Sequence, residues 1–297
     1  MTSPSTIDEY SVLPIRDGVH EADPARPIRI RSAKLARSLA HGASADRVDA
    51  PPMAPPLGTA ANRQNAQLPT FAPLLEELEV AGWSSHRRML SGNFHDWLLL
   101  EGRTLLVMTG QSVPTQNTDA IDPIEAALVA QGAWASIRSH AHHACDAGTL
   151  LSLAAQSLWA TANLDVHTAV AIALIDLDGG RASVAMAGDC MAIKVKATGT
   201  EQIANRQPVL GSAPSFTYLS HTVQLSLRER IMLVADEPRR RPDKLMAKVA
   251  STFSRLDAEA HRRMMAADAI ALVREVYEGH ADENGRGAAS IVAVKRR

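Results

Sequence analysis

Four side chains that can bind a transition metal lie close together in the sequence, at His140, His142, His143 and Cys145. Imidazole and thiolate are both ligands that zinc accepts. On a helix, however, His140 and His143 share one face while His142 points away, and the spacing matches no recognised zinc pattern. We therefore interpret this cluster as the polar end of a helix, where histidine also interacts favourably with the helix dipole, and expect no metal there.

Three serines, Ser84, Ser85 and Ser91, are candidates for a nucleophile. An activated serine needs a general base beside it, and in many hydrolases a sharp strand-to-helix turn presents its hydroxyl. The neighbouring sequence supplies neither feature. It therefore does not support a serine-hydrolase mechanism.

The stretch 91–110 carries the most chemical information. It begins with Ser-Gly-Asn-Phe-His-Asp, continues into the apolar run Trp-Leu-Leu-Leu, and after Glu-Gly-Arg enters a second apolar run that ends at Gly110. This order resembles the sporulation-phosphatase (SpoIIE-like) branch of the metal-dependent type 2C (PPM) protein phosphatases. In that branch a Gly-Gly-Asp-aromatic-x-Asp turn leads into a strand, a hairpin, a second strand and a metal-binding turn.

Five further segments resemble the same family in the same order. They are the entry strand at 78–80, the start of a long helix at 146–151, the central hairpin at 167–189, a ligand-bearing strand at 230–236 and the closing strand at 290–297. Together the matching elements cover about residues 74–297. An ordered set of this length is more specific than any single short motif.

The resemblance implies a site for two Mg²⁺ or Mn²⁺ ions, which prefer oxygen ligands and activate a bridging water. It places the family's ligand positions at Asn93, Gln111, Asp236 and either Gly287 or Ala288, of which only Asp236 is an acid. Four carboxylates would balance two divalent cations, and a close pair of unit charges contributes about 4 kcal/mol at an effective dielectric constant of about 20. We therefore expect no bound metal pair and no cofactor.

Two features beside these positions have candidate roles. Asp96 keeps the second aspartate of the motif, and we expect it to cap the turn before the strand; the alternative is a residual metal ligand acting with Asp236. Arg87 and Arg88 lie near the place where the family has basic residues, and they are a candidate phosphate contact, although a solvated pair is the simpler interpretation. A rearranged metal site would draw on His95, Asp96, Asp119, Asp122 and Asp236.

The elements expected to position these residues alternate strands with paired helices. Asp122 precedes a proline and then Glu125, which predicts a helix from there to about His140. Asp146 can cap a second helix, antiparallel to the first, that ends near Asn163. The remaining pattern predicts strands at 169–176, 181–187, 191–196, 222–225 and 230–235, and helices at 243–256 and 257–278.

Hairpins with inserted helix pairs, rather than repeating βαβ units, favour an α+β fold. The resemblance further implies two mainly antiparallel β-sheets in a sandwich flanked by antiparallel helix pairs. Residues 1–73 are rich in Pro, Ser, Ala, Asp and Arg and cannot bury enough apolar area to offset their ordering entropy. We therefore expect a largely disordered tail at 1–73 and a phosphatase-like domain at 74–297.

The composition narrows the range of partners. With 31 basic and 32 acidic side chains and a formal net charge of −1, the chain has no long-range field to recruit nucleic acid or an anionic membrane. Its two cysteines, Cys145 and Cys190, form no Cys-x-x-Cys motif, which favours reduced thiols and a cytoplasmic protein. No signal-peptide pattern is visible, and no apolar run reaches the roughly 20 residues of a membrane span.

These observations predict a catalytically impaired phosphatase domain, a pseudophosphatase, that works in phospho-signalling by binding another protein such as a phosphoprotein or a regulator. The alternative is a divergent metal-dependent serine/threonine phosphatase with a rearranged metal site. A third reading is a structural subunit whose partner surface lies on its helices.

Overall fold

The computed structural model describes residues 68–69, 72–84, 91–114, 122–159, 166–203, 206–213, 215–236, 242–278 and 289–297. Most of the segment 1–73 lies outside this set, so the expected tail and its boundary with the domain remain predictions. No helix among the described residues combines the length and the apolarity that crossing a membrane requires.

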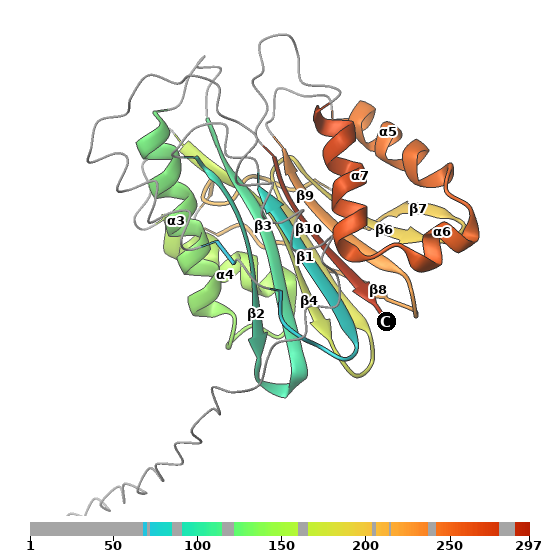
Figure 1. The fold of residues 1–297 in the computed structure, drawn as a ribbon. Coiled ribbons are helices and arrows are strands. Elements are labelled where there is room, and N and C mark those ends of the chain that lie inside the picture. The colour runs from blue at the N-terminus through green and yellow to red at the C-terminus, as the bar shows by residue number, and fades with distance from the viewer. Residues whose placement is uncertain are drawn as a thin grey trace, which may run out of the picture. The chain divides into compact units, whose positions relative to one another are not determined.

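Two five-stranded antiparallel sheets form the body of the fold (Figure 1). Sheet A joins, in spatial order, β1 (Leu78–Ser84), β10 (Ala289–Arg296), β9 (Arg230–Asp236), β6 (Cys190–Lys196) and β7 (Gly199–Gln202). Sheet B joins β2 (Asn93–Leu100), β3 (Thr104–Pro114), β4 (Val166–Asp176), β5 (Arg181–Ala187) and β8 (His221–Gln224). The α+β prediction of two antiparallel sheets is confirmed, whereas the short strand β7 was missed by the sequence analysis.

Helices cover the outer faces of both sheets (Figure 1). α3 (Pro123–His140) and α4 (Ala147–Trp159) pack on sheet B, and α5 (Pro242–Ser254), α6 (Ala258–Arg263) and α7 (Ala266–Glu278) lie beside sheet A. A one-turn 3₁₀ helix, Glu101–Arg103, joins β2 to β3.

Alternation of side chains along the central strand β4 separates the apolar layers. Ala171, Ala173 and Ile175 point into the core between the sheets, while Ile172 and Leu174 point toward α3 and α4. The strand is therefore apolar on both faces, as a strand covered on both sides must be.

The predicted helix starts are confirmed at both capping aspartates. The Asp122 side chain accepts a hydrogen bond from the backbone N–H of Ile124 at 2.9 Å, and Asp146 accepts one from the N–H of Thr149 at 3.0 Å. These bonds satisfy amide groups that lack a partner within the first helical turn. The two helices run antiparallel (Figure 1), and the expected extension of the second to about Asn163 lies outside the described residues.

The expected single helix at 257–278 is wrong, because the chain breaks between α6 and α7. At the break, Met264 has an extended ψ of 124°. The Arg230 side chain, only 1% exposed, donates hydrogen bonds to the carbonyls of His261, at 2.6 Å, and Met264. The buried guanidinium of Arg230, from strand β9, thus binds carbonyl groups at the C-terminal end of α6. The sequence around the helix end does not reveal this contact.

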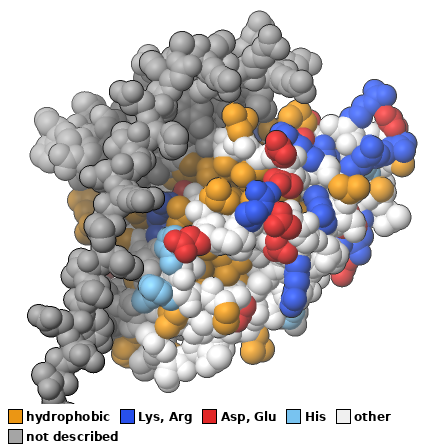
Figure 2. Space-filling model, turned by 90° about the horizontal axis from the view of Figure 1, so that it is seen from below, with side chains coloured by type: hydrophobic (Ala, Val, Ile, Leu, Met, Phe, Trp, Pro, Cys, Tyr) orange, Lys and Arg blue, Asp and Glu red, His pale blue; other side chains and the backbone are white. Residues whose placement is uncertain are grey.

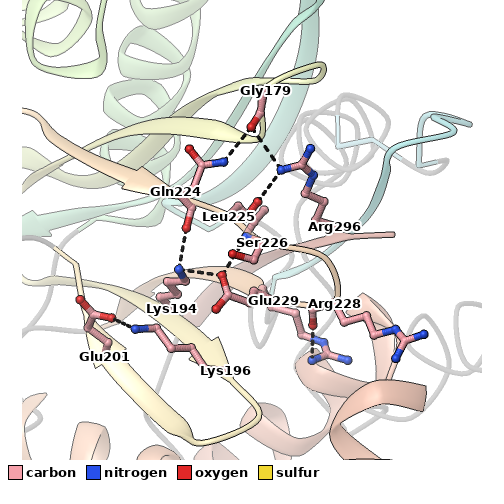
Figure 3. Close-up of polar contacts among 11 residues, drawn as sticks. Gly179, Lys194, Lys196, Glu201, Gln224, Leu225, Ser226, Arg228, Glu229 and Arg296 are labelled. Atoms are coloured by element: carbon pink, nitrogen blue, oxygen red, sulfur yellow. Dashed lines mark hydrogen bonds and ion pairs between the residues drawn. The ribbon is translucent and has the colours of Figure 1, made fainter.

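Polar contacts link the two sheets at the end of the sandwich where β6 and β10 finish (Figure 3). Lys194 of sheet A forms an ion pair with Glu229 at 2.6 Å and donates to the Gln224 carbonyl of sheet B. Arg296 of β10 donates to the carbonyls of Leu225, at 2.8 Å, and Gly179, at 3.2 Å. These contacts hold the two sheets together at the end opposite the predicted metal site.

Charges on the visible face of the space-filling view are mixed in sign (Figure 2). Acidic and basic side chains are interspersed there rather than gathered into one patch. This face therefore offers no strong single-sign field.

Two helical glycines provide a matched test of the packing. A Cβ added at Gly148 of α4 would lie 2.4 Å from the Tyr218 carbonyl oxygen, whereas one at Gly132 of α3 would meet only Leu158, at 3.6 Å. We expect Gly148→Ala to lower the free energy of unfolding by about 1–3 kcal/mol through overpacking. Gly132→Ala should raise it by up to about 1 kcal/mol through helix propensity. Urea denaturation measures both, and a Gly148→Ala variant as stable as the parent would contradict the described packing.

Candidate functional site

The predicted ligand positions come together at one end of the sandwich, which we call the rim. β2 begins at Asn93, Gln111 lies near the end of β3, and β9 ends at Asp236, opposite Ala289 at the start of β10. The Ser290 hydroxyl donates to the Phe94 carbonyl at 2.7 Å, which places the start of β10 against the start of β2. The fold therefore gathers these positions, although Gly287 and Ala288 themselves lie outside the described residues.

Asn93 and Gln111 are direct cross-strand partners on sheet B. Their side chains share the face on which Trp97 and Val107 pack into the core between the sheets. Both are buried, with exposed fractions of 1% and 5%. Gln111 Oε1 accepts no hydrogen bond from any described residue. Two neutral amides therefore occupy the positions at which the sequence resemblance predicts the first two anionic ligands.

The inward-facing residues next to Gln111 in the register of β3 and β4 carry no carboxylate. Thr109, the next inward residue on β3, is fully buried. His167, at the rim end of β4, is half-buried, and burial lowers its pKa, which favours the neutral imidazole. Among the described residues, no three His, Cys, Asp or Glu side chains are grouped to hold a metal ion. The described side chains at the rim do not fit a pair of divalent cations, which need anionic oxygen ligands.

Asp96 lies on the opposite face of β2, toward α3. Its carboxylate is only 4% exposed and accepts hydrogen bonds from Trp134 Nε1 and from the backbone N–H of Trp97, both at 2.8 Å. Arg138 forms an ion pair with the same carboxylate and lies over the Trp134 ring, 5.0 Å from its centroid. The expected turn cap is therefore wrong: Asp96 is a buried anchor for α3 within the strand.

His95 is the rim residue whose setting the sequence analysis missed. It points between the sheets, and its Nδ1 lies 2.7 Å from the Ser84 hydroxyl of β1. The inference that no base lies beside Ser84 is therefore wrong. Strand alternation could have predicted that His95 points inward, but only the packing of sheet A on sheet B brings Ser84 to it.

The proposed rearranged site finds little support in these positions. Asp122 caps α3, and Asp96 is bound to α3, while His95 contacts Ser84. Asp119, together with the candidate phosphate contacts Arg87 and Arg88, lies outside the described residues.

In the cluster of His140, His142, His143 and Cys145, the contacts in the structure are local hydrogen bonds. α3 ends at His140, whose Nε2 lies 2.7 Å from the Ser157 hydroxyl, so the expectation that His143 shares a helix face with it is wrong. Cys145 instead contacts the Asp146 carboxylate at 3.4 Å. Burial raises the pKa of Asp146, but hydrogen bonds from Thr149 outweigh this and hold it below its usual value.

A hollow of about 480 Å³ lies far from the rim, between the α3–α4 connection and the opposite ends of the strands of sheet B. Leu100 and Leu174 are among its apolar lining residues, and Asp146 and Asp176 are among its acids. Both carboxylates accept hydrogen bonds from nearby backbone amides. The hollow therefore does not extend the candidate site.

Comparison with known families identifies this architecture. The family model for stage II sporulation protein E (SpoIIE) matches residues 123–297. The chain belongs to the SpoIIE family. A comparison with curated protein sequences found no match.

Solved structures share the fold of this SpoIIE-family domain. The SiaA-PP2C domain of Pseudomonas aeruginosa has a TM-score of 0.62 at 15% identity, over 81% of this chain and 95% of that one. The RsbU and RsbW domains of a Mycobacterium tuberculosis protein have a TM-score of 0.57 at 16% sequence identity, and the match covers 76% of this chain and 61% of that one. The phosphatase domain of SpoIIE from Bacillus subtilis, solved with a fragment of its regulatory domain, has a TM-score of 0.56 at 12% sequence identity. The match covers 74% of this chain and 63% of that one.

The chain thus spans less than two thirds of the Mycobacterium and Bacillus structures. At these identities the likeness establishes the PP2C-type fold, and the chemistry of the site must come from the residues of this chain.

Asp96 provides a test of the distinction between anchor and ligand. Asp96→Ala removes the acceptor of three hydrogen bonds, and we expect it to lower the free energy of unfolding by about 2–4 kcal/mol. Asp178→Ala, which removes an exposed ion-pair partner of Arg103, should cost less than about 1 kcal/mol. Chemical denaturation compares the two variants. A stable Asp96→Ala protein that had lost affinity for Mn²⁺ would instead identify Asp96 as a ligand.

Proposed function

We propose that this SpoIIE-family domain is a pseudophosphatase, which keeps the phosphatase fold but acts by binding another protein. The observation that carries the proposal is the buried pairing of Asn93 with Gln111 across β2 and β3. These positions face each other between the sheets, where the family arrangement requires negative charge. Amide oxygens supply dipoles but no net charge to a divalent cation.

Charge balance predicts that the rim has little affinity for a pair of divalent cations. A cation pair brought into this buried region loses hydration, and close carboxylates normally offset that loss. Each missing unit charge removes about 4 kcal/mol of attraction at an effective dielectric constant of about 20. Asp236 alone cannot make up this difference. Without the ions, no bound water of lowered pKa is available to attack phosphorus, and no cation stabilises the developing charge.

The role as a binding module rests on the retained fold together with the family relationship. The solved neighbours include a protein that combines RsbU and RsbW domains and a protein described as a cell fate determinant. Both descriptions fit regulatory proteins, and this domain fits a regulator that recognises a protein partner, with a phosphoprotein as one class of partner. In this role the apolar core maintains the binding surface, and metal ions are not required.

The alternative function is a divergent metal-dependent serine/threonine phosphatase. One observation favours it: Gln111 Oε1 is buried, and no described residue donates a hydrogen bond to it. Buried acceptors usually have a donor, an ordered water or an ion as a partner. A single Mg²⁺ or Mn²⁺ that takes Gln111 Oε1 as one of its ligands would be such a partner.

Metal titration separates these two functions. We expect no binding of Mn²⁺ or Mg²⁺ tighter than about millimolar, because a one-acid site lacks the required charge. At a hundredfold excess over its dissociation constant, a bound ion would stabilise the protein by about 2.7 kcal/mol, which a thermal melt detects. Hydrolysis of a phosphomonoester with Mn²⁺ should equal that of Asp236→Ala. Turnover that disappears in Asp236→Ala would establish the alternative.

Restoring the acids tests whether the backbone has kept the geometry of a metal site. The double variant Asn93→Asp with Gln111→Asp places two carboxylates in one buried row, so we expect lower stability without metal. Mn²⁺ should then raise its melting temperature by neutralising that repulsion. The control, Asn93→Ala with Gln111→Ala, removes the amides without adding charge and should show no Mn²⁺ response. Equal responses in both variants would show that these positions do not govern metal binding.

A further inference from the structure

A chain of hydrogen bonds joins the two sheets at the rim. His95 Nδ1 lies 2.7 Å from Ser84 Oγ, and Ser84 Oγ lies 2.5 Å from Ser290 Oγ. Ser290 in turn donates to the carbonyl of Phe94 at 2.7 Å. Ser84 and Ser290 face each other on β1 and β10 of sheet A, while His95 and Phe94 belong to β2 of sheet B. All three side chains are buried.

The direction of these bonds follows from counting protons. A carbonyl oxygen only accepts, and a serine hydroxyl has one proton to donate. Ser290 uses its proton on Phe94, so the proton between the two serines must come from Ser84. Ser84 then has none left for His95, and His95 must donate from Nδ1. The four groups therefore form a one-way relay from His95 through Ser84 and Ser290 to the Phe94 carbonyl.

This direction distinguishes the pair from a catalytic dyad. A histidine that activates a serine must accept the hydroxyl proton, whereas His95 donates a proton to Ser84. The relay also sets the neutral imidazole as the Nδ1–H tautomer, with the lone pair on Nε2. Ser84 is therefore held as a link between strands.

The space for the His95 ring is provided by a glycine. A Cβ added at Gly82 on β1 would lie 2.3 Å from Cδ2 and 2.8 Å from Nε2 of His95. On the other side, the rings of His95 and Trp97 lie with their centroids 5.8 Å apart. The absence of a side chain at Gly82 thus lets the imidazole enter between the sheets and reach Ser84.

We propose that Ser84, His95 and Ser290 are positioning residues that close the rim without metal ions. The relay binds β1 and β10 of sheet A to β2 of sheet B, immediately beside Asn93 and the position opposite Asp236. Ions shared by ligands from both sheets could make the same connection, but this relay consists of hydrogen bonds among three side chains and one backbone carbonyl. It sets the spacing of the two sheets at the rim whether or not a partner is bound there.

The first experiment reads the tautomer in the full-length, unmodified protein. Nitrogen-15 NMR of the His95 ring, in EDTA at a pH where the ring is neutral, distinguishes a protonated Nδ1 from a protonated Nε2. The relay requires the Nδ1–H form. A ring protonated at Nε2 would overturn the proposal, because Ser84 would then be the donor.

Two variants connect the tautomer to the closure of the rim. Ser290→Ala frees the Ser84 proton, so His95 should lose its fixed tautomer, and hydrogen exchange at the rim ends of β1 and β2 should accelerate about tenfold. Ser112→Ala is the matched control, because Ser112 is also buried and donates to a carbonyl, that of Ala126, but lies outside the relay. It should leave the His95 tautomer unchanged. Equal effects of the two variants on His95 would contradict the relay.

A metal comparison keeps this inference separate from the proposed function. Exchange protection at the rim of the unmodified protein should be the same in EDTA and in Mn²⁺. Protection that appears only with Mn²⁺ would overturn the metal-independent closure. Turnover with Mn²⁺ combined with the Nδ1–H tautomer and unchanged protection would reject the pseudophosphatase but leave the relay standing.

Discussion

The register of β2 against β3 is the constraint on which the rim depends. In an antiparallel pair a shift by one residue would move every side chain to the other face of the sheet. The observed register places Asn93 opposite Gln111 and leaves Asp96 facing α3. The apolar residues that alternate with them, packed against sheet A on one side and helices on the other, make any other register costly.

The same constraint separates the acidic and the neutral chemistry of this region. The face of β2 that looks toward sheet A carries Asn93 and His95, whose surroundings are hydroxyl, amide and imidazole groups. The face that looks toward α3 carries the carboxylate of Asp96, which a guanidinium and an indole N–H already bind. Because neighbouring residues of a strand point to opposite faces, the Asp96 carboxylate is kept away from the face that carries Asn93 and Gln111.

The stability of the fold has an energetic basis away from the rim. Three apolar clusters fill the space between the sheets and beneath both helical layers, and none of them depends on an ion. Polar contacts at both ends of the sandwich add connections between the sheets, through Lys194 and Arg296 at one end and through Ser84, His95 and Ser290 at the rim. The SpoIIE family relationship therefore describes the scaffold, and the side chains at the rim decide its chemistry.

The sequence by itself determined the elements whose signals are local, together with the family. The capping residues Asp122 and Asp146, the alternation along the strands and the order of motifs were sufficient for the helix starts and the α+β class, because these features depend on neighbours along the chain. Only the tertiary structure decided the roles of Asp96, Ser84 and Arg230. Each acts on residues distant in sequence, and those contacts arise from the packing of sheets and helices, which no local pattern specifies.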